Sequence, residues 1–374
     1  MGRNVAIVGG GVSGLTAAAE LHRAGHGVTV FEAGAHAGGH THTHDVALAD
    51  GSSWRVDTGF IVMNDRNYPN FTRILEEIGV ATQATNMSFG VSDDAGRFEW
   101  SARGLRGVFA QPRHAVDPRF LRMLVDIARF NRRARKLTGA RGSGPSLRAF
   151  LETHGFSDYF IERLLVPQAA SIWSADPAQM WSFPAAFLAE FFENHGTLQM
   201  LRRPQWRTVA GGSDSYVRAL SAPFADSVHT QTPVDRIERL ADGVVIDSRR
   251  GRERFDDVVI ATHSDQALRM LADPSDAERE ILGAIPYRAN ETVLHTDASL
   301  MPRRRAAWAS WNFHLTDEGE RTTLTYDMNR LQRLDAPEPF LVTLNRTEAI
   351  DPTKVHRVIT VSYTHLTLPT NREV

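Results

Sequence analysis

The chain has 374 residues, of which 42% are hydrophobic and 23% charged, and its formal net charge is −2. This length accommodates two domains with a real hydrophobic core, and the ordinary globular composition argues against a disordered or fibrous chain. A nucleic-acid-binding protein normally carries a basic excess, which this charge balance does not provide.

Signals for export or membrane insertion are not found in the sequence. There is no cysteine, which rules out disulfides, thiolate nucleophiles and cysteine-ligated zinc and fits a reducing compartment. The first expected strand begins at Val5, so we expect no signal peptide. No stretch approaches the roughly 18 consecutive apolar residues of a membrane span. Position 6 is Ala, where N-myristoylation requires Ser or Thr. We therefore predict a cytoplasmic protein.

A strand, a glycine-rich turn and a helix are expected at the start of the chain. Residues 5–8 are apolar, a turn with G-x-G-x-x-G spacing follows, and an Ala- and Leu-rich helix continues over 15–24. The first glycine of this pattern permits a tight turn, the second lets the backbone approach a pyrophosphate, and the third lets the helix pack closely. Free N–H groups and the helix dipole favour an anion at the helix N-terminus. The residues predicted to hold the pyrophosphate are Gly9, Gly11, Val12, Ser13 and Gly14.

A second strand over 28–31 ends at Glu32, which lies eighteen residues after Gly14. A carboxylate at this place accepts hydrogen bonds from the ribose hydroxyls of an adenine dinucleotide and repels a 2′-phosphate. Ala33 is next to it and belongs to the same predicted contact. A βαβ unit that binds no ligand is the alternative, and the combined spacing favours dinucleotide binding.

The residues after this strand distinguish between dinucleotides. Gly38, Gly39, His40 and Thr41 follow the ribose carboxylate, and at this point the chain resembles the flavin superfamily of amine oxidases, protoporphyrinogen oxidase and phytoene desaturase. The resemblance implies that the glycine pair lets the backbone touch the pyrophosphate of FAD. The family usually has Arg or Lys where this chain has His40. The likeness is greatest to a bacterial branch described only as predicted NAD/FAD-binding proteins, and it extends to about Thr360.

His40, His42 and His44 alternate with threonines. On a strand this period places the three imidazoles on one face, which allows either a metal site or a polar strand beside the flavin phosphates. We adopt the second interpretation and predict no metal.

A strand and turn are expected over 54–60. In the resembled family a comparable Asp-x-Gly turn lies near the flavin, which makes Asp57, Thr58, Gly59 and Phe60 candidate cofactor neighbours. The alternative is a tight turn that needs Gly59 for its backbone alone.

Long amphipathic helices are expected from about residue 89, and we assign them to a substrate domain. A basic cluster at 132–136 ends one of them, which indicates a solvated helix end or, alternatively, contact with an anionic membrane surface. Residues 173–192 form the densest aromatic stretch of the chain. Part of this stretch must be core, and the surplus is a candidate lining for an apolar substrate pocket.

The chain is expected to return to the cofactor domain at a glycine-glycine turn over 208–213. Strands follow over 228–231, 234–240, 244–249 and 254–260, with hairpin turns at Asp242-Gly243 and Arg250-Gly251. The resemblance implies that the backbone of Val234 contacts the adenine. It also implies that Ala261 and Thr262 form a turn under the dinucleotide.

Residues 266–360 are expected to return to the substrate domain, with a helix over 277–282 and strands over 291–296, 307–313, 322–328 and 340–345 that form one antiparallel sheet. Its polar and aromatic residues are candidates to face a ligand: Trp308, Trp311, Asn312, His314 and Tyr326. Residues 361–374 resemble an in-frame translation of a sequencing adapter, so we exclude them from fold reasoning. The resembled family ends with a further strand and helix beside the isoalloxazine. We therefore expect a chain that is truncated near Thr360 and that binds FAD poorly or not at all.

The predicted fold class is α/β, with a discontinuous Rossmann-like FAD-binding domain and a second, α+β substrate domain of helices and an antiparallel sheet. The first domain is predicted over 1–85 and 206–265. The second is predicted over 86–205 and 266–360, and 361–374 is a non-native tail.

The predicted function is that of an FAD-dependent oxidoreductase which transfers a hydride from an apolar, lipid-like or unsaturated acyl substrate to the flavin. No catalytic base and no electron acceptor are assigned. The alternatives are a flavin amine oxidase, an NAD-dependent dehydrogenase, and a non-catalytic flavin-binding protein or inactive fragment. Gly38-Gly39 and the strands over 234–260 argue against the dehydrogenase.

Overall fold

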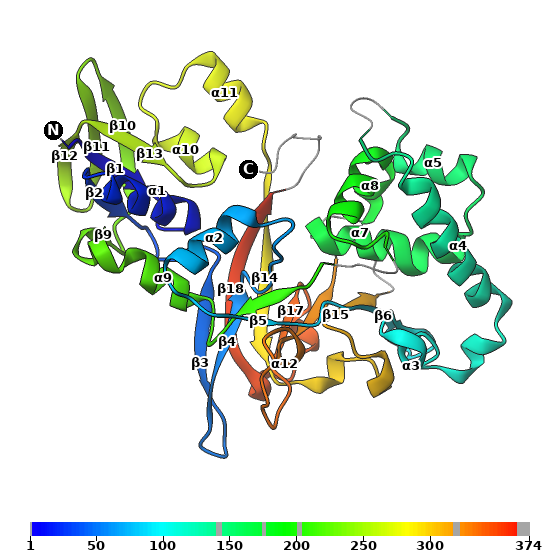
Figure 1. Ribbon diagram of the computed structural model, residues 1–374. Helices are drawn as coiled ribbons and strands as arrows, with labels where there is room; N and C mark the ends of the chain where they lie inside the picture. Colours follow the sequence, from blue (N-terminus) through cyan, green and yellow to red (C-terminus); the bar gives the residue numbers. More distant parts are fainter. Residues whose placement is uncertain (1, 140–143, 174–176, 200–203, 317–321, 365–374) are drawn as a thin grey trace. The chain divides into compact units, whose positions relative to one another are not determined.

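The computed structural model describes residues 2–139, 144–173, 177–199, 204–316 and 322–364. Its helices and strands are shown in Figure 1. The chain forms two compact units, each assembled from three stretches. Unit 1 consists of Met1–Ile61, Arg73–Thr82 and Val209–Tyr287, and unit 2 consists of Val62–Thr72, Gln83–Thr208 and Arg288–Val374.

A parallel sheet with the strand order β13-β1-β2-β9 is the centre of unit 1. The predicted strand–helix–strand start is confirmed, because α1 connects the parallel neighbours β1 and β2. Val5, Ala6, Ile7 and Val8 are buried, as expected for a strand covered on both faces. The bounds are β1 (Asn4–Val8), α1 (Val12–Arg23), β2 (Gly27–Phe31), β9 (Val228–His229) and β13 (Asp257–Ile260).

A second, antiparallel sheet in unit 1 consists of β10 (Val234–Leu240), β11 (Gly243–Ser248) and β12 (Gly251–Phe255). Its two turns lie where the sequence predicted hairpins, since Leu240 pairs with Gly243 and Ser248 pairs with Gly251. The two sheets enclose one hydrophobic core, made of Ala6, Val8, Phe31, Ile237, Val244, Ile246 and Phe255.

The single strand predicted over 254–260 is wrong, because the chain changes sheets at Asp256. β12 pairs with β11, whereas β13 pairs in parallel with β1. Backbone and side chain of Asp256 both bond to Asn4: its N–H donates to the Asn4 carbonyl at 2.9 Å, and its carboxylate accepts from the Asn4 N–H at 2.7 Å. Periodicity alone does not mark such a change of sheet.

Unit 1 also contains a two-stranded antiparallel ribbon formed by β3 and β4, and the predicted cofactor neighbours Asp57, Thr58 and Gly59 lie at the end of β4. The bounds are β3 (His42–Ala47), β4 (Ser53–Gly59), α9 (Asp214–Ser221), α10 (Ser264–Met270) and α11 (Asp276–Gly283).

The largest differences between the units and the predicted domains lie at two places. Residues 266–287 belong to unit 1, because the Ala272 N–H donates to the Ile237 carbonyl at 2.9 Å and Arg239 forms ion pairs at the start of α11. Residues 62–72 belong to unit 2, where Met63 and Arg207 exchange two backbone hydrogen bonds of 2.9 and 2.8 Å.

Unit 2 is organised on a seven-stranded sheet with the order β18-β14-β17-β16-β15-β6-β7. The pairings among β14, β15, β16 and β17 are antiparallel as predicted, but β6 joins β15 in parallel, so the sheet is mixed. Residues 361–364 end β18, and 365–374 lie outside the described residues. The bounds are β6 (Phe89–Asp93), β7 (Glu99–Ser101), β14 (Tyr287–His295), β15 (Trp311–Leu315), β16 (Leu324–Asp327), β17 (Leu341–Leu344) and β18 (Val355–Thr364).

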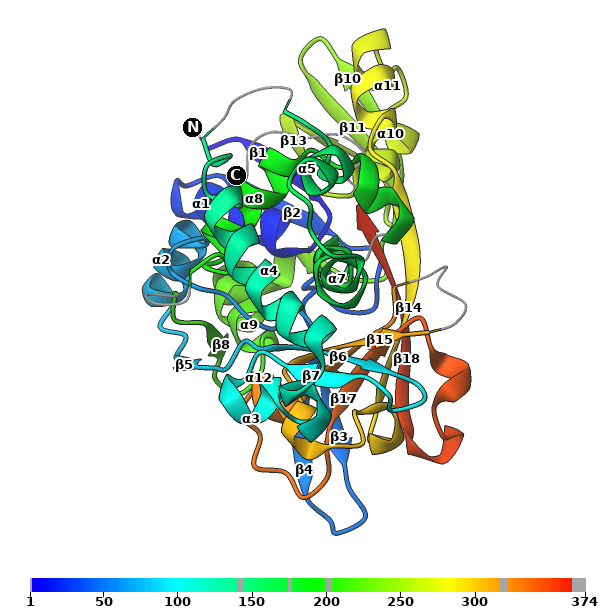
Figure 2. The same cartoon turned by 90° about the vertical axis from the view of Figure 1, so that its right-hand side faces the viewer.

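A cluster of helices packs on this sheet, with α4, α5, α7 and α8 gathered together in Figure 2. Asp117 and Ser146 cap two of them, accepting from the N–H groups of Arg119 and Ala149. The bounds are α4 (Pro118–Ala134), α5 (Leu147–Thr153), α6 (Asp158–Phe160), a π-helical turn at Ile161–Leu165, α7 (Val166–Trp173) and α8 (Ala185–Asn194).

The aromatic stretch over 173–192 lies largely in the core of unit 2. Phe183 and Phe192 are buried, and Trp181, Phe187 and Phe191 pack against the same cluster. The described aromatic side chains of this stretch are therefore accounted for by packing in or against this core.

Shorter elements complete the chain: α2 (Pro69–Glu77), β5 (Thr82–Ala84), α3 (Gly104–Val108), β8 (Arg207–Val209) and α12 (Met328–Leu331). Among the described residues, none of the helices combines the length and the apolar character that a membrane crossing requires. The predicted basic cluster lies at the end of α4, where the Arg135 guanidinium donates to the Leu198 carbonyl at 2.6 Å.

Candidate functional site

The predicted cofactor residues of unit 1 gather at the carboxyl ends of its parallel strands. Val8 is in register with Phe31 of β2 and with Ile260 of β13. The residues that follow these three strand ends are therefore neighbours in space, and this edge is where open α/β sheets bind ligands. The segments brought together are Gly9–Gly11, Glu32–Ala33 and Ala261–Thr262.

Steric contacts explain the glycines at positions 9 and 14. Gly9 has φ +106°, and a Cβ there would lie 2.5 Å from the Ala261 carbonyl oxygen. A Cβ on Gly14 would lie 1.9 Å from the Gly9 carbonyl oxygen. Any side chain at either position would push the first turn of α1 away from the strand ends.

The first turn of α1 provides an anion site made of backbone. The helix begins after Gly11, no side chain caps it in the described structure, and its first turn contains no acidic residue. Its leading N–H groups, at Val12, Ser13 and Gly14, thus carry the positive end of the helix dipole and are not capped by a side chain. A pyrophosphate fits such a terminus.

The second glycine pair lies directly against this turn. Gly38 forms a bridge with Gly11, and its N–H donates to the Gly10 carbonyl at 2.8 Å. A Cβ on Gly39 would come within 3.0 Å of the Gly11 Cα. Two chain segments thus meet here as bare backbone, and this cradle suits the close approach of a dinucleotide phosphate.

Glu32 is half-buried beside the cradle. Its Oε2 accepts from the Gly10 N–H at 2.7 Å, and its Oε1 accepts from the Gly34 N–H at 2.6 Å. Each carboxylate oxygen has two lone pairs, so both retain capacity for ribose hydroxyls. The backbone of Glu32 accepts from the Thr232 N–H at 2.8 Å, and this contact brings the start of β10, with Val234, to the same edge.

His40 is exposed and lies near a second imidazole. Its ring centroid is 5.8 Å from that of His263, and the His263 ring stacks on Tyr287 at 4.4 Å. Burial lowers the pKa of His263, and the charge of His40 lowers it further. Thr41, the next predicted residue, is buried and shares a hydrogen bond with the Tyr216 hydroxyl.

The prediction that His40, His42 and His44 lie on one face of a strand is wrong for His40. β3 begins at His42, so His40 precedes the strand, and the ring that stacks on His42 is that of His36, at 3.9 Å. His44 lies beyond, 3.9 Å from His42 between ring centroids. The reversal of the chain at Gly38-Gly39 produces this arrangement. Within the described ranges, no three His, Asp or Glu side chains are placed to hold a metal ion.

Asp57 is fully buried at the end of β4, so its carboxylate is closed off from solvent. It accepts from the Thr43 hydroxyl at 2.6 Å, from the Ser213 N–H at 3.0 Å and from the Ser213 hydroxyl at 2.8 Å. Burial raises the pKa of Asp57 to about 6 against the opposing effect of these hydrogen bonds. The side chain therefore holds the Gly211-Gly212 turn against β4.

The other residues of the predicted Asp-x-Gly turn lie beside the same hydrogen-bond network. Thr58 is buried, with its hydroxyl 3.1 Å from Nε2 of His44. A Cβ on Gly59 would lie 1.8 Å from the His40 carbonyl oxygen. Phe60 has φ +47°, and its carbonyl oxygen lies 2.7 Å from the Ser213 hydroxyl oxygen. Thr43 and Ser213 were not predicted; the only sequence signal was that Ser213 follows a glycine pair.

The candidate ligand-facing residues of unit 2 are mostly used within its sheet. Asn312 is fully buried and bonds the backbone of Ala309 and Thr325. His314 is buried with Nε2 2.8 Å from the Thr325 hydroxyl, and burial lowers its pKa to about 3. Trp308 donates to a backbone carbonyl, and Trp311 and Tyr326 pack against the helical core.

A family model described as "Flavin containing amine oxidoreductase" matches residues 12–310. The chain belongs to this family. Membership confirms the predicted flavin cofactor, FAD. It also agrees with the cradle of bare backbone beside Glu32, which fits a dinucleotide.

Individual relatives are distant. An L-amino-acid oxidase from Siganus canaliculatus is 24% identical over 316 residues, which cover 79% of this chain and 57% of that protein. The chain spans 57 to 59% of the length of the curated relatives that it matches.

Solved structures confirm the fold class. Cyclohexylamine oxidase from Brevibacterium oxydans has a TM-score of 0.64 at 17% identity, covering 97% of this chain and 85% of that chain. A fatty acid isomerase from P. acnes that produces CLA has a TM-score of 0.61 at 18% identity, covering 97% and 86%. At such identities the likeness concerns the fold alone.

Proposed function

We propose that the protein oxidises a small molecule by transferring a hydride from a substrate carbon to FAD. The observation that supports this most is the bare-backbone cradle at the N-terminus of α1, in a chain of the flavin-containing amine oxidoreductase family. In this proposal unit 1 binds the cofactor and unit 2 receives the substrate.

Each predicted site residue then has a task. Gly9–Gly14 and Gly38–Thr41 surround the pyrophosphate, Glu32 with Ala33 receives the ribose, and Val234 approaches the adenine through its backbone. Ala261 and Thr262 close the turn beneath the dinucleotide. Asp57–Phe60 act through their backbone. The carboxylate of Asp57 is buried and bonded to Ser213, so it does not contact the cofactor in this proposal.

The bound FAD would supply the hydride acceptor, and the chain would supply alignment and exclusion of water. We assign no catalytic base: the His314 imidazole of β15 is buried and bonded to the Thr325 hydroxyl of the neighbouring strand. The electron acceptor is likewise left open.

For the substrate we favour an amine or amino acid. The relatives and structural neighbours support this, since they include an L-amino-acid oxidase and a cyclohexylamine oxidase. An apolar acyl substrate is the second candidate, supported by the fatty acid isomerase among the structural neighbours. The aromatic stretch does not support it, because its described side chains belong to the core.

Anaerobic titration tests both candidates. The protein is purified with its flavin, its visible spectrum is recorded, and alkylamines, L-amino acids and unsaturated fatty acids are added separately. Bleaching by amines or amino acids alone supports the favoured class, and bleaching by fatty acids alone supports the second. Full flavin occupancy without bleaching by any of them contradicts catalysis, and release of a nicotinamide dinucleotide on heating contradicts the choice of FAD.

A further inference from the structure

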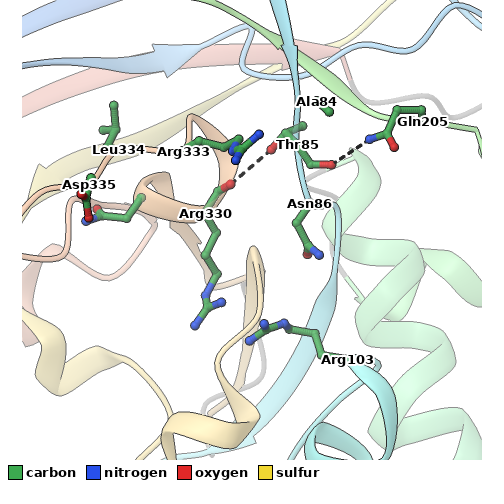
Figure 3. Close-up of a pocket in the computed structure, with 10 residues that line it drawn as sticks. Ala84, Thr85, Asn86, Arg103, Gln205, Arg330, Arg333, Leu334 and Asp335 are labelled. Carbon is green, nitrogen blue, oxygen red and sulfur yellow. Dashed lines mark hydrogen bonds between the residues drawn. The ribbon is translucent and has the colours of Figure 1, made fainter.

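A polar pocket lies in unit 2, and none of its described lining residues belongs to the predicted cofactor site. Its volume is about 570 Å³, within the range of sites that bind small molecules. Three arginines line it, with amide side chains beside them: Arg103, Arg330, Arg333, Asn86, Gln205 and Asn329. Figure 3 shows the pocket and most of these side chains.

Two guanidinium groups converge in this pocket. Arg103 follows β7, Arg330 lies on α12, and in Figure 3 their guanidinium groups point toward one another. Burial lowers the pKa of Arg103, and the positive charge of Arg330 lowers it further, with a smaller opposing effect from Asp327. The two like charges therefore repel each other across the space between them.

Two carboxylates lie near these guanidinium groups. Asp327 is buried and pairs with Arg330, with its Oδ2 2.7 Å from the Arg330 Nε. Arg103 donates to the neutral Trp308 carbonyl at 3.0 Å. Among the described lining residues, Asp335 is the only acidic one, and its side chain is exposed, as is that of Arg333. The described lining thus contains three guanidinium groups and one carboxylate.

The frame around the arginines is held by hydrogen bonds. The Thr85 hydroxyl donates to the Leu331 carbonyl at 2.5 Å and lies 3.2 Å from the Arg330 carbonyl, and the Gln205 amide donates to the Thr85 carbonyl at 3.2 Å (Figure 3). Asn329 bonds the backbone of the segment beyond α12 through both ends of its amide. The backbone that carries Arg330 is therefore fixed in place before any ligand arrives.

We propose that this pocket binds the carboxylate of a small, polar organic acid between Arg103 and Arg330. A guanidinium fork matches the planar, two-oxygen geometry of a carboxylate and donates two parallel hydrogen bonds to it, and the second guanidinium would donate to the remaining lone pairs. One bound negative charge would relieve the repulsion between them. The polar lining favours a short acid over a long acyl chain. Flavin chemistry plays no part in such binding.

Calorimetric titration of the full chain at low salt tests the proposal with glutarate, its neutral diamide glutaramide, and inorganic phosphate. We expect glutarate to bind at least about tenfold more tightly than glutaramide, because charged hydrogen bonds are stronger than neutral ones. Equal binding of acid and amide, or binding of phosphate without glutarate, would overturn it. The titration is repeated on flavin-free protein, so its outcome is independent of catalysis.

Arg103 is the residue to replace, because Arg330 also neutralises buried Asp327. Arg103→Gln should weaken glutarate binding about tenfold, and Arg103→Lys should weaken it less, since charge is kept without the fork. Arg106→Gln is the matched control, an exposed arginine of the adjacent α3 that does not line the pocket. Unchanged affinity in both Arg103 variants, each checked for folding by thermal melting, would contradict the assignment.

Discussion

The buried carboxyl of Asp57 makes a quantitative prediction about stability. Its pKa is raised from an ordinary value of 3.8 to about 6, first by burial and further by the charge of Asp214. Hydrogen bonds from Thr43 and Ser213 oppose the shift without cancelling it. Asp214 is itself paired with Arg55 and Arg218. The ionised form of Asp57 is therefore disfavoured in the folded chain.

The sign of the pH dependence follows from the raised pKa. The folded state binds the proton of Asp57 more tightly than the unfolded state, so stability from this group is fully present below about pH 4 and is lost as the pH rises through about 6. At about 1.4 kcal/mol per pKa unit, a shift of about two units corresponds to roughly 3 kcal/mol.

Hydrogen-bond geometry indicates that Asp57→Asn relieves this cost. The Ser213 hydroxyl has one hydrogen, and the Phe60 carbonyl lies within bonding distance at 2.7 Å. The amide of the variant would donate to the Ser213 oxygen, while its carbonyl would accept from the Thr43 hydroxyl and the Ser213 N–H. We expect the variant to be more stable than the parent near neutral pH, by about 1 to 3 kcal/mol.

Urea denaturation of both proteins, near neutral pH and at about pH 4.5, provides the measurement. The stability difference should shrink on acidification, because the parent then regains its proton. A difference that stays constant with pH, or a variant less stable than the parent near neutrality, would refute the reasoning. Asp57→Leu is the control for lost hydrogen bonds and should be destabilised at both pH values.

Three further substitutions test other parts of the structure. Gly14→Ala should destabilise the protein by more than about 2 kcal/mol in urea denaturation, because the new Cβ would lie 1.9 Å from the Gly9 carbonyl oxygen. Gly283→Ala is its control and should be close to neutral, since the new Cβ would meet its nearest neighbour at an ordinary 3.7 Å. Glu32→Ala should lower the flavin-to-protein absorbance ratio several-fold by removing the predicted ribose acceptor. Asp126→Ala should cost about 2 to 4 kcal/mol by thermal denaturation, since this fully buried carboxylate anchors two arginines and a helix cap.

Each of these expectations has an outcome against it. Normal stability of Gly14→Ala would contradict the close packing of α1. Unchanged flavin content in Glu32→Ala, relative to the exposed control Glu20→Ala, would contradict the ribose contact. An Asp126→Ala protein that melts with the parent would show that its ion pairs are solvated and weak.

The local sequence pattern was sufficient to predict the first part of the cofactor site, from the glycine turn at Gly9 to Glu32. The strand, the glycine turn, α1 and the strand that ends at Glu32 lie within about thirty consecutive residues, and each contact among them is set by nearby spacing. Family resemblance then supplied FAD, because Gly38-Gly39 follows at a characteristic distance. The fold class could be predicted for the same reason.

Tertiary structure decided what depends on partners far apart in the chain. The parallel pairing of β6 with β15 joins residues more than two hundred positions apart, and no period in either strand encodes it. The hydrogen bonds of Ser213 to Asp57 and the convergence of Arg103 with Arg330 arise in the same way. A sequence pattern reports which face of its own element is apolar, whereas the identity of the group facing it is settled only when the whole chain packs.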